Sequence, residues 1–88
     1  MRSIRSIRSE GPQGPVYITF SDDIVTDTEP IEENDEVVVD YGADGEVVRV
    51  ELVSVSSDTL GGLLQVARIH DLDLGALFAR SIPLKHAA

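Results

Sequence analysis

The sequence predicts an α+β fold in which an antiparallel β-meander of about four strands is covered on one face by one or two C-terminal α-helices. Two patterns support this prediction. Apolar and polar residues alternate through the first half of the chain, with the period of two that is typical of a half-buried strand. After Ser56 the apolar residues recur about every 3.6 positions, which is typical of a helix with one buried face.

One folded domain is expected over residues 16–82, because a chain of 88 residues has no room for a second hydrophobic core. The sheet is assigned to residues 16–56 and the helical segment to residues 57–82. Residues 1–15 begin with a three-residue repeat, RSIRSIRS, that fits neither period, and they end in Gly and Pro. We therefore predict a flexible basic N-terminal tail there and a short C-terminal tail over residues 83–88.

Four strands are expected, at residues 16–20, 24–28, 37–41 and 46–55. The first two are predicted to pair as a hairpin, and an acidic connection leads from the second to the third. Gly42 and Gly45 accommodate a tight turn between the last two strands. Alternation gives the sheet one charged face and one apolar face, the latter formed by Val16, Ile18, Phe20, Val37, Val39, Val48, Val50 and Leu52.

Two short helices are expected after the sheet. Ser57 or Asp58 can cap the first, and Asp71 or Asp73 can cap the second, which Pro83 ends. The predicted apolar stripes are Leu60, Leu63, Leu64 and Ala67 on the first helix and Leu74, Leu77, Phe78 and Ile82 on the second.

Composition excludes several classes of function. The absence of Cys removes disulfides, thiolate metal sites and Cys nucleophiles, and it fits a cytoplasmic location. The net charge is −9, of which residues 11–57 carry −11 while residues 1–10 carry +2. An acidic centre repels phosphate, so no binding to nucleic acid is expected. The apolar runs fall short of the ~20 residues of a membrane span, so no membrane association is expected either.

The segment over residues 16–56, VYITFSDDIVTDTEPIEENDEVVVDYGADGEVVRVELVSVS, resembles a family of short bacterial proteins catalogued as domain of unknown function 2283. The shared features are an aromatic first strand, an acidic stretch, an Asp-Tyr pair, an Asp-Gly turn and an aliphatic last strand. Tyr17, Asp40, Tyr41, Asp44, Gly45 and Glu51 hold the matching positions. Family members often have Gly where this chain has Arg49, and a shorter C-terminal extension. The resemblance implies a fold and no catalytic residues.

Asp40, Asp44 and Glu51 follow part of the spacing of a calcium-binding loop, with Gly45 at the turn position. Gly42, however, occupies a position where such loops carry Asp or Asn, and strands rather than helices are expected on both sides. A β-hairpin with an Asp-Gly turn is therefore favoured over a divalent-ion site, and the carboxylates are expected to form a solvated charged face.

No enzyme signature is found. His70 and His86 lack partners at catalytic or metal-ligand spacing, and no Gly-x-Ser-x-Gly turn or phosphate-binding loop is present. We therefore predict a protein without enzymatic activity and without cofactors.

Two classes of function remain after these exclusions. The favoured one is a protein-interaction module that binds a basic partner, including a small toxin-like protein that it would neutralise. The alternative is a protein that binds a small ligand or a divalent ion on the charged hairpin face. A homodimer is also expected, because one small sheet has little room for both helical stripes, and the interface candidates are Leu74, Leu77, Phe78 and Ile82.

Overall fold

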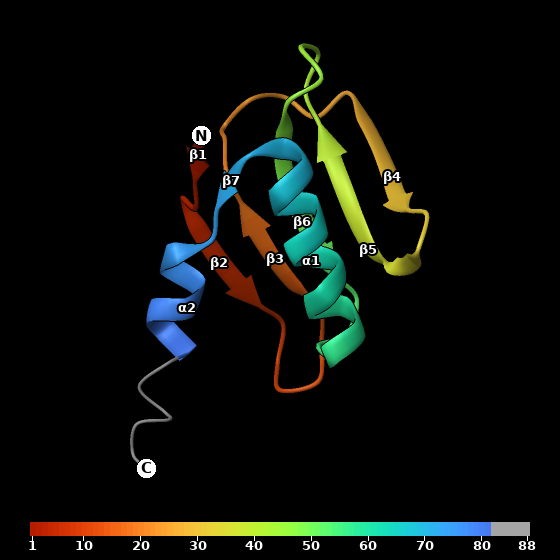
Figure 1. Cartoon of the computed structure of the whole chain (residues 1–88), viewed down its shortest axis with the longest axis vertical. Helices are drawn as coiled ribbons and strands as arrows, with labels where there is room; N and C mark the ends of the chain where they lie inside the picture. Colours follow the sequence, from red (N-terminus) through yellow and green to blue (C-terminus); the bar gives the residue numbers. More distant parts are fainter. Residues whose placement is uncertain (82–88) are drawn as a thin grey trace.

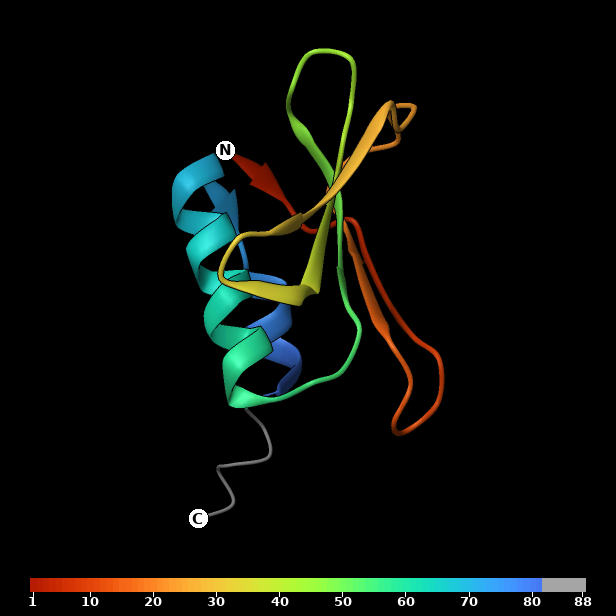
Figure 2. The same cartoon turned by 90° about the vertical axis from the view of Figure 1, so that its right-hand side faces the viewer.

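The computed structural model describes residues 1–81 and has two layers, a sheet and the helices on one of its faces (Figures 1 and 2). The helices are α1 (Ser57–His70) and α2 (Gly75–Ser81). The strands are β1 (Arg2–Ser3), β2 (Ser6–Ser9), β3 (Val16–Thr19), β4 (Asp27–Ile31), β5 (Asn34–Tyr41), β6 (Val47–Leu52) and β7 (Leu72–Asp73). This arrangement confirms the predicted α+β class with an antiparallel sheet and a helix packed against it.

The main sheet has five strands in the order β2-β3-β6-β5-β4, more than the four predicted. The predicted hairpin between residues 16–20 and 24–28 is wrong, because β3 pairs with β2 on one side and with β6 on the other. After β3 the chain crosses to the opposite edge of the sheet, where β4 pairs only with β5 (Figure 1). The sheet is therefore a hairpin joined to a three-stranded meander, and local strand propensity does not distinguish this order from the predicted one.

Residues 2–9 are part of the folded domain, which corrects the prediction of a flexible tail over residues 1–15. Strand β2 pairs with β3 in antiparallel register, and β1 pairs with β7 in parallel. Ile4 and Ile7 pack against the hydrophobic core. The repeat does not predict these strands, because neither β1 nor β2 is long enough to show the alternation of a strand.

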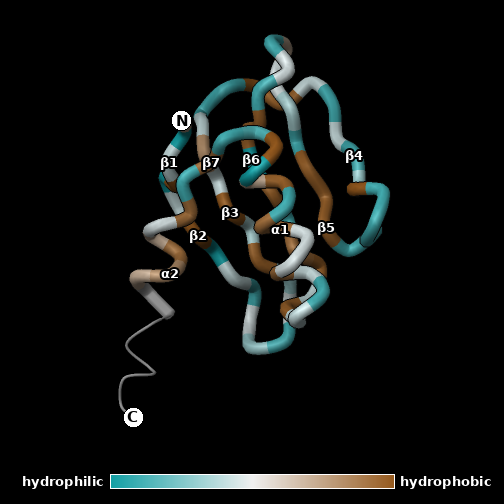
Figure 3. The backbone as a smooth tube through the Cα atoms, in the orientation of Figure 1, coloured by the Kyte–Doolittle hydropathy of each residue, from teal (hydrophilic) through white to brown (hydrophobic). Residues whose placement is uncertain are grey.

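The apolar sheet face predicted from the alternation is the face that α1 covers. Ile18, Val37, Val39 and Val50 are completely buried. Phe20 and Leu52 are nearly so, and Val16 packs at the margin of this core. Val48 is buried too, but Val47 belongs to the core cluster in its place, next to the shift of the β5–β6 register between Asp40 and Tyr41. Figure 3 shows hydrophobic segments along β3, β5 and α1, and a hydrophilic turn between β4 and β5. The core is thus a single layer between the sheet and α1.

Helix α1 turns only part of the predicted stripe toward the sheet, namely Leu63 and Ala67. Its buried residues are Thr59, Gly62, Leu63, Val66 and Ala67, whereas Leu60 and Leu64 are exposed at 39% and 46%. The cap is Ser56, not Ser57 or Asp58, and its side chain accepts a hydrogen bond from the Thr59 amide. Thr59 is fully buried and donates its hydroxyl proton to the Ser54 carbonyl, so this polar residue replaces Leu60 on the inner face.

Gly62 determines how closely α1 approaches the sheet. A Cβ atom at this position would lie 2.9 Å from side-chain carbons of both Ile31 and Val37. The neighbouring Gly61 faces open space, with no atom within 4 Å of such a Cβ. Of the two glycines that weaken the helix, Gly62 therefore allows close packing and Gly61 has no contact that requires it.

The C-terminal segments form two separate elements divided by β7. The Asp73 carboxylate accepts a hydrogen bond from the Gly75 amide and caps α2, as one of the two predicted caps. Leu74 is buried in this chain's own core and Leu77 packs against it, while Phe78 is 47% exposed. The other predicted features of this region, Ile82, Pro83, His86 and the tail over residues 83–88, lie outside the described residues. None of the helices within residues 1–81 is long and apolar enough to cross a membrane.

Candidate protein-interaction surfaces

The three carboxylates predicted as candidate metal ligands have separate partners. Asp40 accepts hydrogen bonds from the Thr28 hydroxyl and from Arg49 Nε, both at 2.7 Å. Asp44 accepts one from the Glu46 amide in the β5–β6 turn. Glu51 lies on the open face of β6, opposite Tyr17 and Val38. No group of three His, Asp or Glu side chains within residues 1–81 is placed to hold a metal ion.

Asp40 also departs from the predicted solvated face. Its residue is only 6% exposed although it points away from α1, because Thr28 of the edge strand and Arg49 of β6 cover it. A buried carboxylate requires such a paired and hydrogen-bonded cation, so Arg49 serves a structural role here.

The remainder of the open face contains an aromatic ring between two cations. The guanidinium of Arg8 lies 4.8 Å from the ring centre of Tyr17, and that of Arg49 lies 5.7 Å from it. These distances are within the range of cation–π attraction. Since Arg49 also binds Asp40 of β5, the four strands β2, β3, β6 and β5 are connected by side chains as well as by backbone hydrogen bonds.

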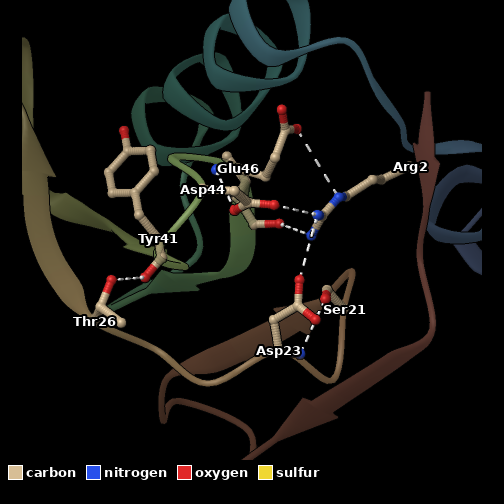
Figure 4. Close-up of polar contacts among 8 residues, drawn as sticks. Arg2, Ser21, Asp23, Thr26, Tyr41, Asp44 and Glu46 are labelled. Carbon is tan, nitrogen blue, oxygen red and sulfur yellow. Dashed lines mark hydrogen bonds and ion pairs between the residues drawn. The ribbon is translucent and has the colours of Figure 1, made fainter.

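A cluster of carboxylates in two loops holds an arginine of the N-terminus (Figure 4). We call Asp22, Asp23, Asp44 and Glu46 the loop cluster. Arg2 donates to the Val47 carbonyl at 2.8 Å and lies 3.5 Å from the carboxylate of Asp23. It also lies 3.7 Å from that of Asp44 and 4.0 Å from that of Glu46. The fourth member, Asp22, pairs with Arg5 at 3.0 Å. Two arginines of residues 1–9, which we call the N-terminal arm, thus offset half of the negative charge of the loop cluster.

A second acidic region has no such cation. The turn between β4 and β5 and the first turn of α1 enclose a groove of about 900 Å³, lined by Glu32, Glu33, Asn34, Asp35, Glu36, Ser56, Asp58, Gly62 and Gln65. We call this the acidic groove. Its five carboxylate residues are all exposed. Within the described part of the chain none of the five belongs to an ion pair, and no Lys or Arg lines the groove.

Two hydrogen bonds from uncharged donors hold carboxylates of the acidic groove in place. The Gln65 side-chain amide donates to Glu33 at 3.2 Å and the Ser54 hydroxyl donates to Glu36 at 2.6 Å. Each links the strand layer to the segment around α1 and holds a carboxylate in place without cancelling its charge. Gly62 lies at the floor, where its lack of a side chain lets α1 approach the β4–β5 hairpin closely. The groove is therefore a preformed, negatively charged concave surface.

A smaller cleft of about 240 Å³ lies beside the groove and includes Tyr41 and His70. Their rings meet edge to face with centres 5.6 Å apart. The pKa of Tyr41 is raised above its usual value, mainly by burial and then by the negative charges of Glu29 and Asp27. The sequence shows no partner for His70 at catalytic or metal-ligand spacing, and its contact with Tyr41 depends on the position of α1.

The described residues thus form a small α+β domain that has an antiparallel sheet with one open face, helices on the other face and two acidic surface regions. Residues 16–56, which run from β3 to the cap of α1, match the model of a family described as "Protein of unknown function (DUF2283)". The resemblance predicted from the sequence is thereby confirmed over the same residues. Neither the curated proteins nor the solved structures contain a match to this chain.

Proposed function

We propose that this protein is a non-enzymatic interaction module whose acidic groove binds a basic segment of a partner protein. The single observation that carries the proposal is the contrast between the two acidic regions. Each carboxylate of the loop cluster lies within 4.0 Å of an arginine of the arm, whereas the groove has five carboxylates and no ion pair in the described residues.

The physical argument begins with the cost of keeping like charges together. Five carboxylates around one concavity repel one another, and dissolved salt screens this repulsion over about 8 Å. A basic segment in the groove would replace repulsion by attraction. Complementary charge also accelerates diffusional encounter with a partner of opposite sign.

The arm shows what kind of side chain fits. Arg2 reaches several acceptors at once because a guanidinium has donors on a planar fork, and the loop cluster uses that property. An arginine-containing segment is therefore the partner chemistry best matched to the acidic groove. A small basic protein of the toxin-like type, neutralised by complex formation, belongs to this partner class.

The test uses a synthetic decapeptide that contains five arginines, titrated into the full chain by calorimetry at low salt. The groove variant Glu32→Gln, Glu33→Gln, Asp35→Asn removes three negative charges. It should weaken binding about tenfold, since three surface charge contacts of about 0.5 kcal/mol each amount to one power of ten.

A matched control separates the groove from general attraction. Asp27→Asn, Glu29→Gln and Glu51→Gln together remove the same charge from carboxylates that lie outside the groove and pair with no cation in the described residues, and this variant should bind almost as tightly as the native chain. If both variants lose affinity equally, the peptide is held only by net charge and the proposed site is wrong. Amide shifts of residues 32–36 in NMR spectra should locate the peptide independently.

A further inference from the structure

The N-terminal arm binds the rest of the chain through strand pairing, ion pairs and apolar packing. An identical arm from a second copy of the chain could make the same contacts. Its strand pairs join it to β3 and β7. Arg2 and Arg5 bind the loop cluster, and Ile4 and Ile7 pack against the core. Within the described residues the ion pair of Arg8 with Glu10 is the arm's one ion pair with a residue before position 16.

The hinge that connects the arm to β3 is tight and closes only with glycine. Residues 10–15 turn back through hydrogen bonds from the Glu10 amide to the Pro15 carbonyl and from the Gly14 amide to the Gly11 carbonyl. Gly11 has a φ of +89°, and a Cβ atom at Gly14 would lie 1.9 Å from the Glu10 carbonyl oxygen. Pro12 and Pro15 in the same hinge favour an extended backbone. The closed conformation of this segment therefore requires glycine at both positions.

We propose that the N-terminal arm exchanges between two copies of this chain, so that the arm of each copy binds the acceptor surface of the other. The acceptor surface consists of the free edge of β3, β7 and the loop cluster. Charge favours binding of the arm to its own chain and to a second copy alike, because residues 1–10 carry +2 and residues 11–57 carry −11. Every contact of the closed form is reproduced, and only the hinge changes.

Concentration determines which form is populated. A short hinge holds the chain's own arm at an effective concentration in the millimolar range, so the closed monomer prevails in dilute solution. Exchange becomes visible near that concentration, or at lower concentration when the hinge cannot close. This route to a dimer is different from the helix-mediated one, since it uses neither Phe78 nor the acidic groove. It is independent of the proposed function.

The experiment uses the register pair Ser6 and Thr19, which face each other on β2 and β3. The variant Ser6→Cys, Thr19→Cys adds the two thiols of a chain that has no other Cys. Copies labelled with ¹⁵N and unlabelled copies are mixed, incubated and oxidised, and disulfide-linked peptides are weighed by mass spectrometry. A peptide pair of mixed label reports an exchanged arm. We expect same-label pairs at 10 µM and mixed pairs near 1 mM (concentrations chosen about the effective concentration of the arm).

Gly14→Ala in this background should shift mixed pairs to a concentration at least about tenfold lower, because its Cβ collides with Glu10 only in the closed hinge. Gly61→Ala, whose Cβ meets nothing, is the matched control and should behave as the parent. Inserting four Gly and Ser residues lengthens the hinge, so that the arm can fold back on its own chain more easily. This variant should reduce the fraction of mixed pairs at 1 mM, and it tests the proposal if Gly14→Ala does not fold. Same-label pairs alone at 1 mM, or mixed pairs that do not respond to hinge length, would overturn arm exchange.

Discussion

The loop cluster and the acidic groove are both rich in carboxylates, yet they differ in what lies beside them. In the loop cluster, four carboxylates surround two arginines of the arm. In the groove, five carboxylates are accompanied by Gln65 and Ser54, whose hydrogen bonds leave the charges uncancelled. The first region contributes to the fold through the arginines that it binds, whereas the carboxylates of the second remain exposed without a paired cation in the described residues.

The comparison shows that net charge does not indicate which acidic residues are free. The value of −9 combines carboxylates already bound by arginine with carboxylates that face solvent. Asp40 is a third case, because its carboxylate is buried on the open face of the sheet and pairs with Arg49. The following predictions change one side of this comparison at a time.

Deleting residues 1–9 should have the largest effect, because it leaves the loop cluster without cations and exposes one edge of β3. We expect the free energy of unfolding to fall by about 3 kcal/mol or more. The lost terms are the partial burial of Ile4 and Ile7, a strand ladder and the arginine contacts. Urea denaturation measures the loss. An unchanged midpoint would mean that the arm contributes nothing to the fold and would restore the flexible-tail prediction.

Gly62→Ala should change the floor of the groove. The added methyl group meets Ile31 and Val37 at 2.9 Å, so we expect a loss of about 1–3 kcal/mol in stability by thermal unfolding. Gly61→Ala is the matched substitution on the same helix and should increase stability by about 0.5–1 kcal/mol, because alanine is the better helix former. Equal effects at the two positions would show that α1 does not pack as described.

Arg2→Met removes the principal cation of the loop cluster while keeping an apolar side chain. The carboxylates are about half exposed, so water offsets most of the loss and we expect destabilisation of about 1 kcal/mol. Arg2→Lys should recover only part of it, because a lysine lacks the planar fork. The difference between Arg2→Met and the native chain should shrink in 1 M salt, where the screening length is about 3 Å. A difference that does not depend on salt would assign the effect to packing.

Asp27→Asn should give the smallest effect, at a site where two carboxylates lie together without arginine. The pKa of Glu29 is raised above its usual value by a hydrogen bond with Asp27, then by the charge of Asp27 and by burial. A carboxyl with a raised folded-state pKa favours folding below its unfolded pKa, and this contribution is lost as pH rises through the raised value.

The substitution should therefore lower the pKa of Glu29 toward its ordinary value, as measured by the carboxyl ¹³C shift in a pH titration. It should also make the variant slightly more stable than the native chain above the raised pKa, with the advantage fading on acidification. A Glu29 titration unaffected by Asp27→Asn would contradict this coupling.

Several elements of the fold could be predicted from local pattern. The alternation correctly places Val50 and Leu52 on the buried face, and Asp73, which accepts a hydrogen bond from the Gly75 amide, is correctly among the predicted caps. The turn before β6 contains Gly45 at φ +81°, as expected of an Asp-Gly turn. These features depend on residues close together in the chain, and their periods are therefore visible in the sequence.

The candidate surfaces were predictable only in part. The acidic character of residues 29–36 is evident from the sequence, but the groove also needs Asp58, Gly62 and Gln65 from α1. Asp40, Asp44 and Glu51, the candidate metal ligands considered from the sequence, lie within a short stretch of the chain and yet have separate partners. Asp40 lies on β5, Asp44 in the β5–β6 turn and Glu51 on β6. The docking of the arm could not be predicted from its three-residue repeat, because Ile4 and Ile7 pack against a core that forms only after folding.

The sequence by itself determined the α+β class, the two-faced sheet, the start of the helical half and the excess of negative charge, since each follows from composition or from periodicity over a few neighbouring residues. Only the tertiary structure decided the strand order, the docking of the arm, the stripe that α1 buries and the burial of Asp40. These depend on pairings such as Arg2 with Val47 and Ile18 with Val50, which are distant in the chain. Such pairings are selected by the fit and charge of whole surfaces, and no local pattern of residues specifies them.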